Sequence, residues 1–291
     1  MTTKEFHCTK RQSSFAGTSA AARGVRRAVT AAVILLGLQG CGPLGLDEED
    51  PKTPTAEQTT VLFIGSSYTA FNNVPDRFRD LSRRAGHRVF VRYHLALGQP
   101  LSYFAQSAAA AAAIRELDWD FVVLQGGAQS AAYPRLGGSS DFLALKELRR
   151  KSTEDSPGTR VVYMMPWAYE DGMTWVEGRD ETYEEMQLDI RDQTLDWAHE
   201  LDLALAPVGM AWYRVLTRKP RNTHFLHDSD WNHASKEGSF LTAATIFSTV
   251  WVEDAGDVGY NWEIDKTLAQ ELRDVAGATV LDSLTLWNIT D

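Results

Sequence analysis

The fold of this chain is decided by the stretch VLFIGSSYTAFNNVP, residues 61–75. Residues 61–64 form an apolar run of β-branched, aliphatic and aromatic side chains, which favours a buried strand. The run stops at Gly65, and two hydroxyl side chains, Ser66 and Ser67, follow directly. A buried strand that ends on two serines indicates either an ordinary polar turn or a loop that presents one serine to a substrate.

Strand-like runs and helical segments alternate along the chain. Strands are expected at 61–64, 88–94, 120–125, 160–165 and 204–208. Helices are expected at 75–86, 101–117, 142–151, 181–201, 239–252 and 264–276. Continuous apolar strands separated by helices predict an α/β fold with a mostly parallel central sheet covered on both faces. Active sites in such folds lie beyond the carboxyl ends of the strands, which is where Ser67 falls.

Residues 1–41 have the pattern of an export signal. Six basic residues precede an apolar run at 28–38, which only Thr30 interrupts, and the sequence LQGC follows at 38–41. A basic start, a short apolar core and a small residue before the cut are typical of a secretory signal peptide. The apolar run is too short to span a bilayer.

Gly40 and Cys41 make this segment similar to a bacterial lipoprotein signal, in which the cysteine is acylated and becomes the new N-terminus. Gln39 departs from the small residue that usually precedes the glycine, so a plain signal peptide cut nearby is the alternative. The expectation is an exported protein of the cell envelope, held to a bacterial membrane through a lipid on Cys41 and in no other way.

The segment after the signal differs in character from the domain that follows. Residues 42–59 are acidic, contain proline and have few large apolar side chains, which predicts a disordered acidic tether. Residues 60–291 show no comparable linker and no internal repeat, so one domain is expected there. The only cysteines, Cys8 and Cys41, lie in the signal, which leaves the domain without a thiol nucleophile or a disulfide.

The charge of the processed chain argues against nucleic acid as a partner. Residues 1–40 hold six basic residues and one acidic residue, so their removal leaves 23 basic against 38 acidic residues, a formal net charge of −15. A surface of that sign repels phosphate backbones.

Asp230 and His233 are a candidate carboxylate–base pair. They are three residues apart in HDSDWNHASKEGS, just before a predicted helix, and residues at that spacing share a face if the stretch turns helically. A serine nucleophile needs a base to accept its proton and a carboxylate to orient that base. Asp230 could therefore hold one imidazole nitrogen of His233 while the other faces a serine.

These residues together resemble a known family. The segment GSSYT at 65–69 is similar to the Gly-Asp/Asn-Ser-x-Thr block of the SGNH (GDSL-like) hydrolases, and Asp230-x-x-His233 matches their C-terminal pair. The segments NNVP, LGQPL, WDFVVLQ, PVGMAW and GSFLTAA are similar to features of bacterial members. The resemblance covers residues 60–290 and implies a three-layer α/β/α sandwich fold. It also implies that the protein hydrolyses acyl or acetyl esters without a metal.

Site roles follow from the resemblance position by position. Ser67 takes the nucleophile's place, while Ser66 stands where the family has Asp or Asn. The family binds the oxyanion with the N–H of the serine, the N–H of a glycine after the second strand, which Gly98 matches, and an asparagine side chain after the third strand. The block Gly-x-Asn-Asp has no literal match here, so Gln129 or Gln125 is the candidate for that amide.

Two segments near these residues allow other interpretations. His224, His227, Asp228 and His233 suggest a zinc site, but His-x-x-His is not the usual i, i+4 pair and no cysteine is available, so neither metal nor cofactor is expected. Trp167 and Trp175 either form a pocket wall for an acyl group or sugar ring, or belong to the core.

Two functions remain open from the sequence. The first is a serine esterase of the cell envelope that acts on a small-molecule or glycan ester. The lipid anchor and the aromatic segment favour carbohydrate acyl or acetyl esters. The second is a catalytically silent domain of the same fold that binds glycan or an envelope partner, motivated by Ser66 and by the missing asparagine. The sequence predicts no oligomeric state.

Overall fold

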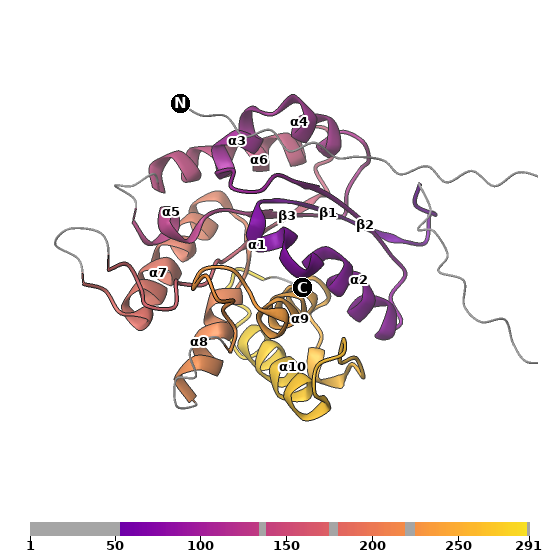
Figure 1. Ribbon diagram of the computed structural model, residues 1–291. Helices are drawn as coiled ribbons and strands as arrows, with labels where there is room; N and C mark the ends of the chain where they lie inside the picture. Colours follow the sequence, from indigo (N-terminus) through magenta and orange to yellow (C-terminus); the bar gives the residue numbers. More distant parts are fainter. Residues whose placement is uncertain (1–52, 134–137, 175–179, 219–224, 290–291) are drawn as a thin grey trace, which may run out of the picture. The chain divides into compact units, whose positions relative to one another are not determined.

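A computed structural model describes residues 53–133, 138–174, 180–218 and 225–289 (Figure 1). Five parallel strands form one sheet in the order β2-β1-β3-β4-β5. The strands are β1 (Thr59–Gly65), β2 (Val89–Leu95), β3 (Phe121–Gln125), β4 (Arg160–Met164) and β5 (Ala204–Ala206). Because the chain moves outward from β1 to β2 and then crosses back to β3, the order reverses between β1 and β3. In such sheets ligands bind at a reversal of this kind, beyond the carboxyl ends of the two strands.

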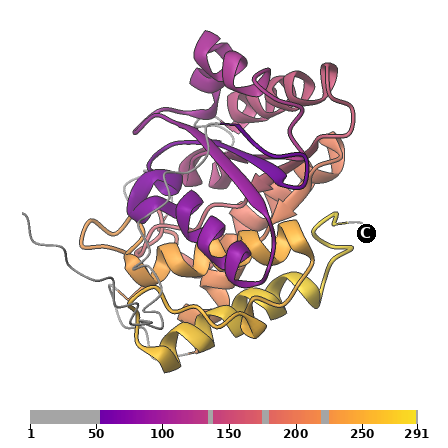
Figure 2. The same cartoon turned by 90° about the vertical axis from the view of Figure 1, so that its right-hand side faces the viewer.

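Helices cover both faces of the sheet. In the part of the chain that the structure describes, the α-helices are α1 (Ser67–Ala70), α2 (Val74–Arg84), α3 (Leu101–Gln106), α4 (Ala108–Ile114), α5 (Ala128–Ala132), α6 (Gly138–Glu154), α7 (Tyr183–Leu201), α8 (Val208–Arg218), α9 (Lys236–Trp251) and α10 (Lys266–Leu281). Two 3₁₀ turns are η1 (Phe71–Asn73) and η3 (Ala255–Asp257). Figure 2 shows α9 and α10, in orange and yellow, on the opposite side of the sheet from the magenta helices α3, α4 and α6.

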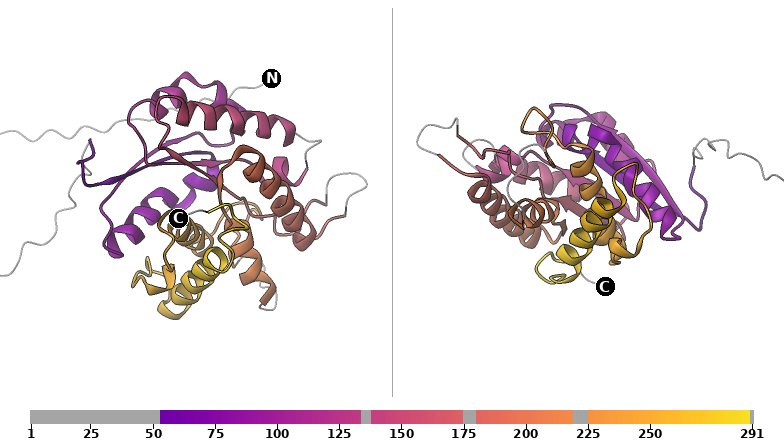
Figure 3. Two further views of the ribbon diagram at one scale, coloured as in Figure 1. Left: turned by 180° about the vertical axis from the view of Figure 1, so that it is seen from behind. Right: turned by 60° about the horizontal axis from the view of Figure 1, so that its bottom comes forward.

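The three-layer α/β/α sandwich predicted from the sequence is confirmed. Helices α3, α4 and α6 pack together on one face, whereas α2, α9 and α10 pack together on the other. Seen from behind, α6 runs along the upper face and α7 lies toward the side of the sheet (Figure 3). Helix α7 packs on α5 and α8 beside the short edge strand β5.

The central helix α9 explains an unusual stretch of sequence. All residues from Gly238 to Val250 are buried, although the stretch contains several hydroxyl side chains. The hydroxyls of Thr242, Thr245 and Thr249 donate to backbone carbonyls of the preceding turn, as Thr245 does to Leu241 at 2.8 Å. The helix can therefore be enclosed on every side without apolar residues throughout.

The structure corrects three of the predicted elements. The helix expected at 101–117 is two helices, because Ser107 leaves helical geometry and its hydroxyl caps α4 by accepting from the N–H of Ala110 at 3.2 Å. The fifth strand stops at Ala206, and the residues from Val208 onward form α8, which was not predicted. Helix α6 is longer than the expected 142–151. None of the helices in the described ranges is long and apolar enough to cross a membrane.

Candidate active site

The loop that follows β1 is braced by Gln125 at the end of the neighbouring strand β3. The Gln125 Oε1 atom accepts from the backbone N–H of Ser66 at 2.7 Å and from the Thr69 hydroxyl at 3.1 Å. Its Nε2 donates to the Gly126 carbonyl at 2.5 Å. A Cβ on Gly65 would lie 2.8 Å from both Gln125 Oε1 and Thr69 Oγ1, so only glycine permits this approach. The serine turn is therefore fixed to the sheet at the reversal between β1 and β3.

Ser67 begins α1, and the residue that ends this helical turn, Phe71, contacts His233. The N–H of Phe71 donates to the carbonyl of Ser67, which closes a helical turn and places these two side chains on the same face. The Phe71 ring stacks on the His233 imidazole with centroids 4.1 Å apart and planes 6° apart. The ring of Tyr68 meets the same imidazole edge-on at 6.0 Å. The structure thus brings His233 to the turn that starts with Ser67, although the two are far apart in sequence.

Asp230 holds the His233 ring in a defined orientation. Its Oδ2 lies 2.5 Å from His233 Nδ1, and its Oδ1 accepts from the backbone N–H groups of His233 at 2.8 Å and Asn232 at 3.1 Å. Partial burial raises the pKa of Asp230, but the bonds from the His233 ring and from the two N–H groups outweigh it and lower that pKa below its ordinary value. A carboxylate on Nδ1 keeps the proton there, which leaves Nε2 as an acceptor.

A buried aromatic stack ties the Asp230–His233 turn to α1. Trp167 has no exposed surface and lies between Tyr68 and Trp212, with centroid distances of 4.3 Å on each side. Its indole Nε1 donates to the carbonyl of Asn232 at 2.9 Å, and the Tyr68 hydroxyl donates to the Asn232 side chain. Burial raises the pKa of Tyr68 well above its usual range, so this hydroxyl remains a donor. Of the two roles considered for Trp167, the structure gives it the core.

The candidate oxyanion groups come from two neighbouring loops. Gly98 follows β2 with φ +68 in a turn that Gln99 closes by donating to Ala96 at 3.3 Å. Gln129 lies in the first turn of α5 with a half-buried side chain. The Gln125 amide oxygen binds the serine loop and its nitrogen donates to Gly126, whereas the Gln129 amide makes no hydrogen bond with the described residues. The geometry therefore favours Gln129 over Gln125 as a donor to substrate.

A buried carboxyl supports the start of α5. Asp141 of α6 is 2% exposed and receives hydrogen bonds from the Ser130 hydroxyl and the Gly127 N–H. Burial raises the pKa of Asp141 more than these bonds lower it. The buried Tyr163 hydroxyl lies beside the same carboxyl, and both lie against the backbone of Gly126. Asp141 thereby anchors the turn that carries Gln129. The sequence does not reveal this role, because an acidic residue in the first turn of a helix is ordinary.

In the histidine-rich segment 224–233, His227 has a structural role. His227 is 2% exposed, and its Nε2 lies 2.8 Å from the carbonyl oxygen of Ala168. Its ring packs edge-on against Trp212 and Tyr183. No group of three or more metal-ligating side chains occurs among the described residues. His224, Trp175 and Cys41 lie outside the described residues.

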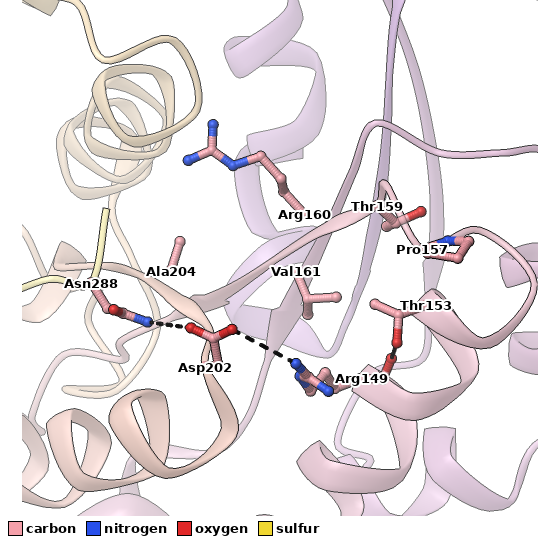
Figure 4. A pocket seen from close by; sticks show the side chains of 9 residues that line it. All are labelled: Arg149, Thr153, Pro157, Thr159, Arg160, Val161, Asp202, Ala204 and Asn288. Carbon is pink, nitrogen blue, oxygen red and sulfur yellow. Dashed lines mark hydrogen bonds and ion pairs between the residues drawn. The ribbon is translucent and has the colours of Figure 1, made fainter. Parts of the chain in front are cut away.

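A hollow of about 390 Å³ lies at the opposite edge of the sheet, near the amino ends of β4 and β5. Figure 4 shows the Asp202 carboxylate there between Arg149, 4.0 Å away, and Asn288, whose amide donates to it at 3.5 Å. These groups satisfy one another at the surface. Because catalytic residues follow the carboxyl ends of parallel strands, this hollow is separate from the site around Ser67.

Comparison with known proteins rests on structure alone. No family model matches the sequence, and no curated protein does. A DUF4886 family protein from Bacteroides uniformis is 18% identical with a TM-score of 0.65, over 77% of this chain and 95% of that one. The structure described as "a putative SGNH hydrolase" from Slackia heliotrinireducens is 24% identical with a TM-score of 0.53, over 66% of this chain and 99% of that one. The acetyl xylan esterase AlAXEase is 14% identical with a TM-score of 0.50, over 66% and 99%.

Proposed function

We propose that this chain, which has the fold of the SGNH hydrolases, is a serine esterase that cleaves acyl or acetyl esters. One observation carries the proposal. The His233 ring stacks on Phe71, at the end of the turn that Ser67 begins, and its Nδ1 lies 2.5 Å from the Asp230 carboxylate. An imidazole oriented by a carboxylate and placed beside a serine is the arrangement that activates a hydroxyl nucleophile.

In the proposed reaction the Ser67 Oγ attacks the ester carbonyl and His233 Nε2 takes the serine proton. The N–H groups of Ser67 and Gly98 and the Gln129 amide bind the oxyanion of the tetrahedral intermediate. His233 then gives the proton to the departing alkoxide, which leaves an acyl-enzyme. Water, deprotonated by His233, hydrolyses this acyl-enzyme, and Asp230 stabilises the imidazolium each time it forms.

The contacts of Gln125 support catalysis over the silent alternative. Ser66 lacks the carboxylate or amide that braces this loop in the family, and that departure motivates a domain that only binds glycan or an envelope partner. Here the brace comes from β3 instead, since Gln125 holds both Ser66 and Thr69. The serine turn is therefore ordered without an Asp or Asn at position 66.

The test uses the chain from residue 51, because residues 51–291 form one compact unit. The wild-type protein should label with a fluorophosphonate and cleave 4-nitrophenyl acetate. Ser67→Ala should lose labelling and lower kcat by at least about 10³-fold, as removal of a triad member does. A Ser67→Ala protein that keeps its activity would refute the nucleophile, and an inert wild-type protein that binds glycan would support the silent domain.

We also propose that the protein is exported and lipid-anchored at Cys41, with residues 42–59 as the tether to the domain. The pattern at 28–41 and the acidic character of the tether support this. In a bacterial host, processing should be sensitive to globomycin, and Cys41→Ala should release the protein from the membrane fraction. A mature chain that begins at another residue without lipid would contradict the anchor.

A further inference from the structure

Trp231 is an exposed indole inside the turn that carries the catalytic pair. It lies between Asp230 and His233 in sequence, and 57% of its surface is exposed, in contrast to the fully buried Trp167. No aromatic ring or cation of the described residues lies on it. Trp262 differs, because Arg77 covers that indole at 4.7 Å. A large apolar ring is therefore presented to solvent two residues from the proposed general base.

The backbone of Trp231 is held in an unfavourable conformation. Its φ of +62 lies in the left-handed region, which bulky side chains rarely adopt and which glycine or asparagine tolerates at lower cost. Asn72 and Asn73, at φ +54 and +58, occupy the same region, which asparagine adopts more readily than tryptophan. Strain of this kind persists where the surrounding structure enforces it, and it is concentrated at functional sites.

Hydrogen bonds on both sides enforce this conformation. The N–H of Trp231 donates to the carbonyl of Asp228 at 3.0 Å, and its carbonyl accepts from the N–H of Glu170 at 2.9 Å. The N–H of Asp228 in turn donates to the carbonyl of His233 at 2.7 Å. The indole therefore stands on a braced turn, and the backbone that carries it is fixed relative to His233 before any ligand binds.

The chemistry of ester cleavage specifies which part of a substrate this indole meets. His233 must reach the alkoxide oxygen to return the proton, so the alcohol part of the ester lies on the His233 side and the acyl part lies toward the oxyanion groups. The side chain of Trp231 belongs to the same turn as His233. That turn therefore borders the alcohol part.

We propose that Trp231 is a specificity residue that stacks on the ring of a neutral sugar, the alcohol part of the ester that this enzyme cleaves. The proposal rests on the proposed esterase function and names its substrate class. A pyranose offers an apolar C–H face to an indole and hydroxyl donors at its rim. Asp228 is exposed three residues before Trp231 and can accept such donors. Together with Asp230 it also repels an anionic alcohol and disfavours a purely apolar one.

The test compares two acetates of primary alcohols that differ in the sugar ring, methyl 6-O-acetylglucopyranoside and ethyl acetate. Trp231→Ala should lower kcat/KM for the sugar ester tenfold or more, mainly through KM, and change that for ethyl acetate by less than about twofold. Trp231→Phe should keep most of the activity on the sugar ester. Trp262→Ala is the matched control and should leave the ratio of the two esters unchanged.

A stability measurement separates this role from a structural one. Trp231→Gly removes the strain, so its Tm should equal or exceed that of the wild type while activity on the sugar ester falls as in Trp231→Ala. A Tm several degrees lower would assign the indole to packing and overturn the proposal. An unchanged ester ratio in Trp231→Ala, or a larger loss on decyl acetate than on the sugar ester, would also overturn it. A wild-type chain that cleaves neither ester through Ser67 would contradict the proposed esterase function itself, on which the role of Trp231 depends.

Discussion

At the scale of single residues, the two glutamines near the site have different duties that their sequence positions do not reveal. Gln125 ends the third strand and Gln129 follows it, and either could have replaced the family's asparagine. Only the contacts show which glutamine is available to a substrate, because the Gln125 amide is already hydrogen-bonded to Ser66, Thr69 and Gly126. The spacing of Asp230 and His233 and the serine after the first strand could be read from the sequence, since both patterns are local.

Replacing each glutamine by leucine should separate the brace from the oxyanion donor. Gln125→Leu leaves the buried N–H of Ser66 without an acceptor, so it should cost about 1–3 kcal/mol of stability and also reduce activity. Gln129→Leu should lower kcat by about 10²–10³ with an unchanged Tm. Thermal denaturation and esterase kinetics on both variants check this. Equal losses of Tm in the two variants would contradict the assignment.

Asp230 should make a pH-dependent contribution to stability. Its pKa is lower in the folded protein, so its contribution is complete above the ordinary value of about 3.9 and is lost as the pH falls through the folded value. The difference in Tm between the wild type and Asp230→Asn should therefore be largest near neutral pH and shrink below pH 4. A difference that stays constant from pH 7 to pH 3 would show that the carboxylate charge plays no part.

At the scale of elements, the sequence predicts long periodic helices and strands well. It predicts the breaks between consecutive elements poorly. The alanine run after Ser107 favours helix so strongly that it conceals the break between α3 and α4. Helix α8 was missed because an apolar segment following a short strand looks like a continuation of that strand, and tertiary packing decides where it turns. Parallel strands could be predicted from their apolar runs, but their order in the sheet depends on long-range pairing.

The cap at Ser107 can be tested by itself. Ser107→Ala removes the acceptor for the Ala110 N–H and should cost about 1 kcal/mol, which is about 2–4 °C in Tm for a domain of this size. Ser107→Asp keeps an acceptor and should be nearly neutral. Esterase activity should be unchanged in both, because α4 packs on α3 and α6 away from the serine turn. A Tm unaffected by Ser107→Ala would mean that the break is imposed by packing alone.

At the scale of the whole molecule, we expect residues 51–291 to fold by themselves. Residues 51–291 form one compact unit, so removal of residues 1–50 should leave a single cooperative unfolding transition and wild-type kcat on soluble esters. Calorimetry and kinetics on the full and shortened chains, both in the same detergent, check this. A shortened chain that aggregates or unfolds in two steps would show that the N-terminal segment supports the fold.

The brace from β3 makes positions 66 and 125 thermodynamically coupled. An acidic side chain introduced at position 66 would meet the Gln125 oxygen, which already accepts from the Ser66 N–H and hydroxyl. The substitution that restores the usual family residue should therefore be harmful alone and become tolerable only when position 125 changes with it. In a double-mutant cycle the two changes should be strongly non-additive. The constraint on the serine loop comes from a neighbouring strand, and mutational tolerance at one position depends on the residue at the other.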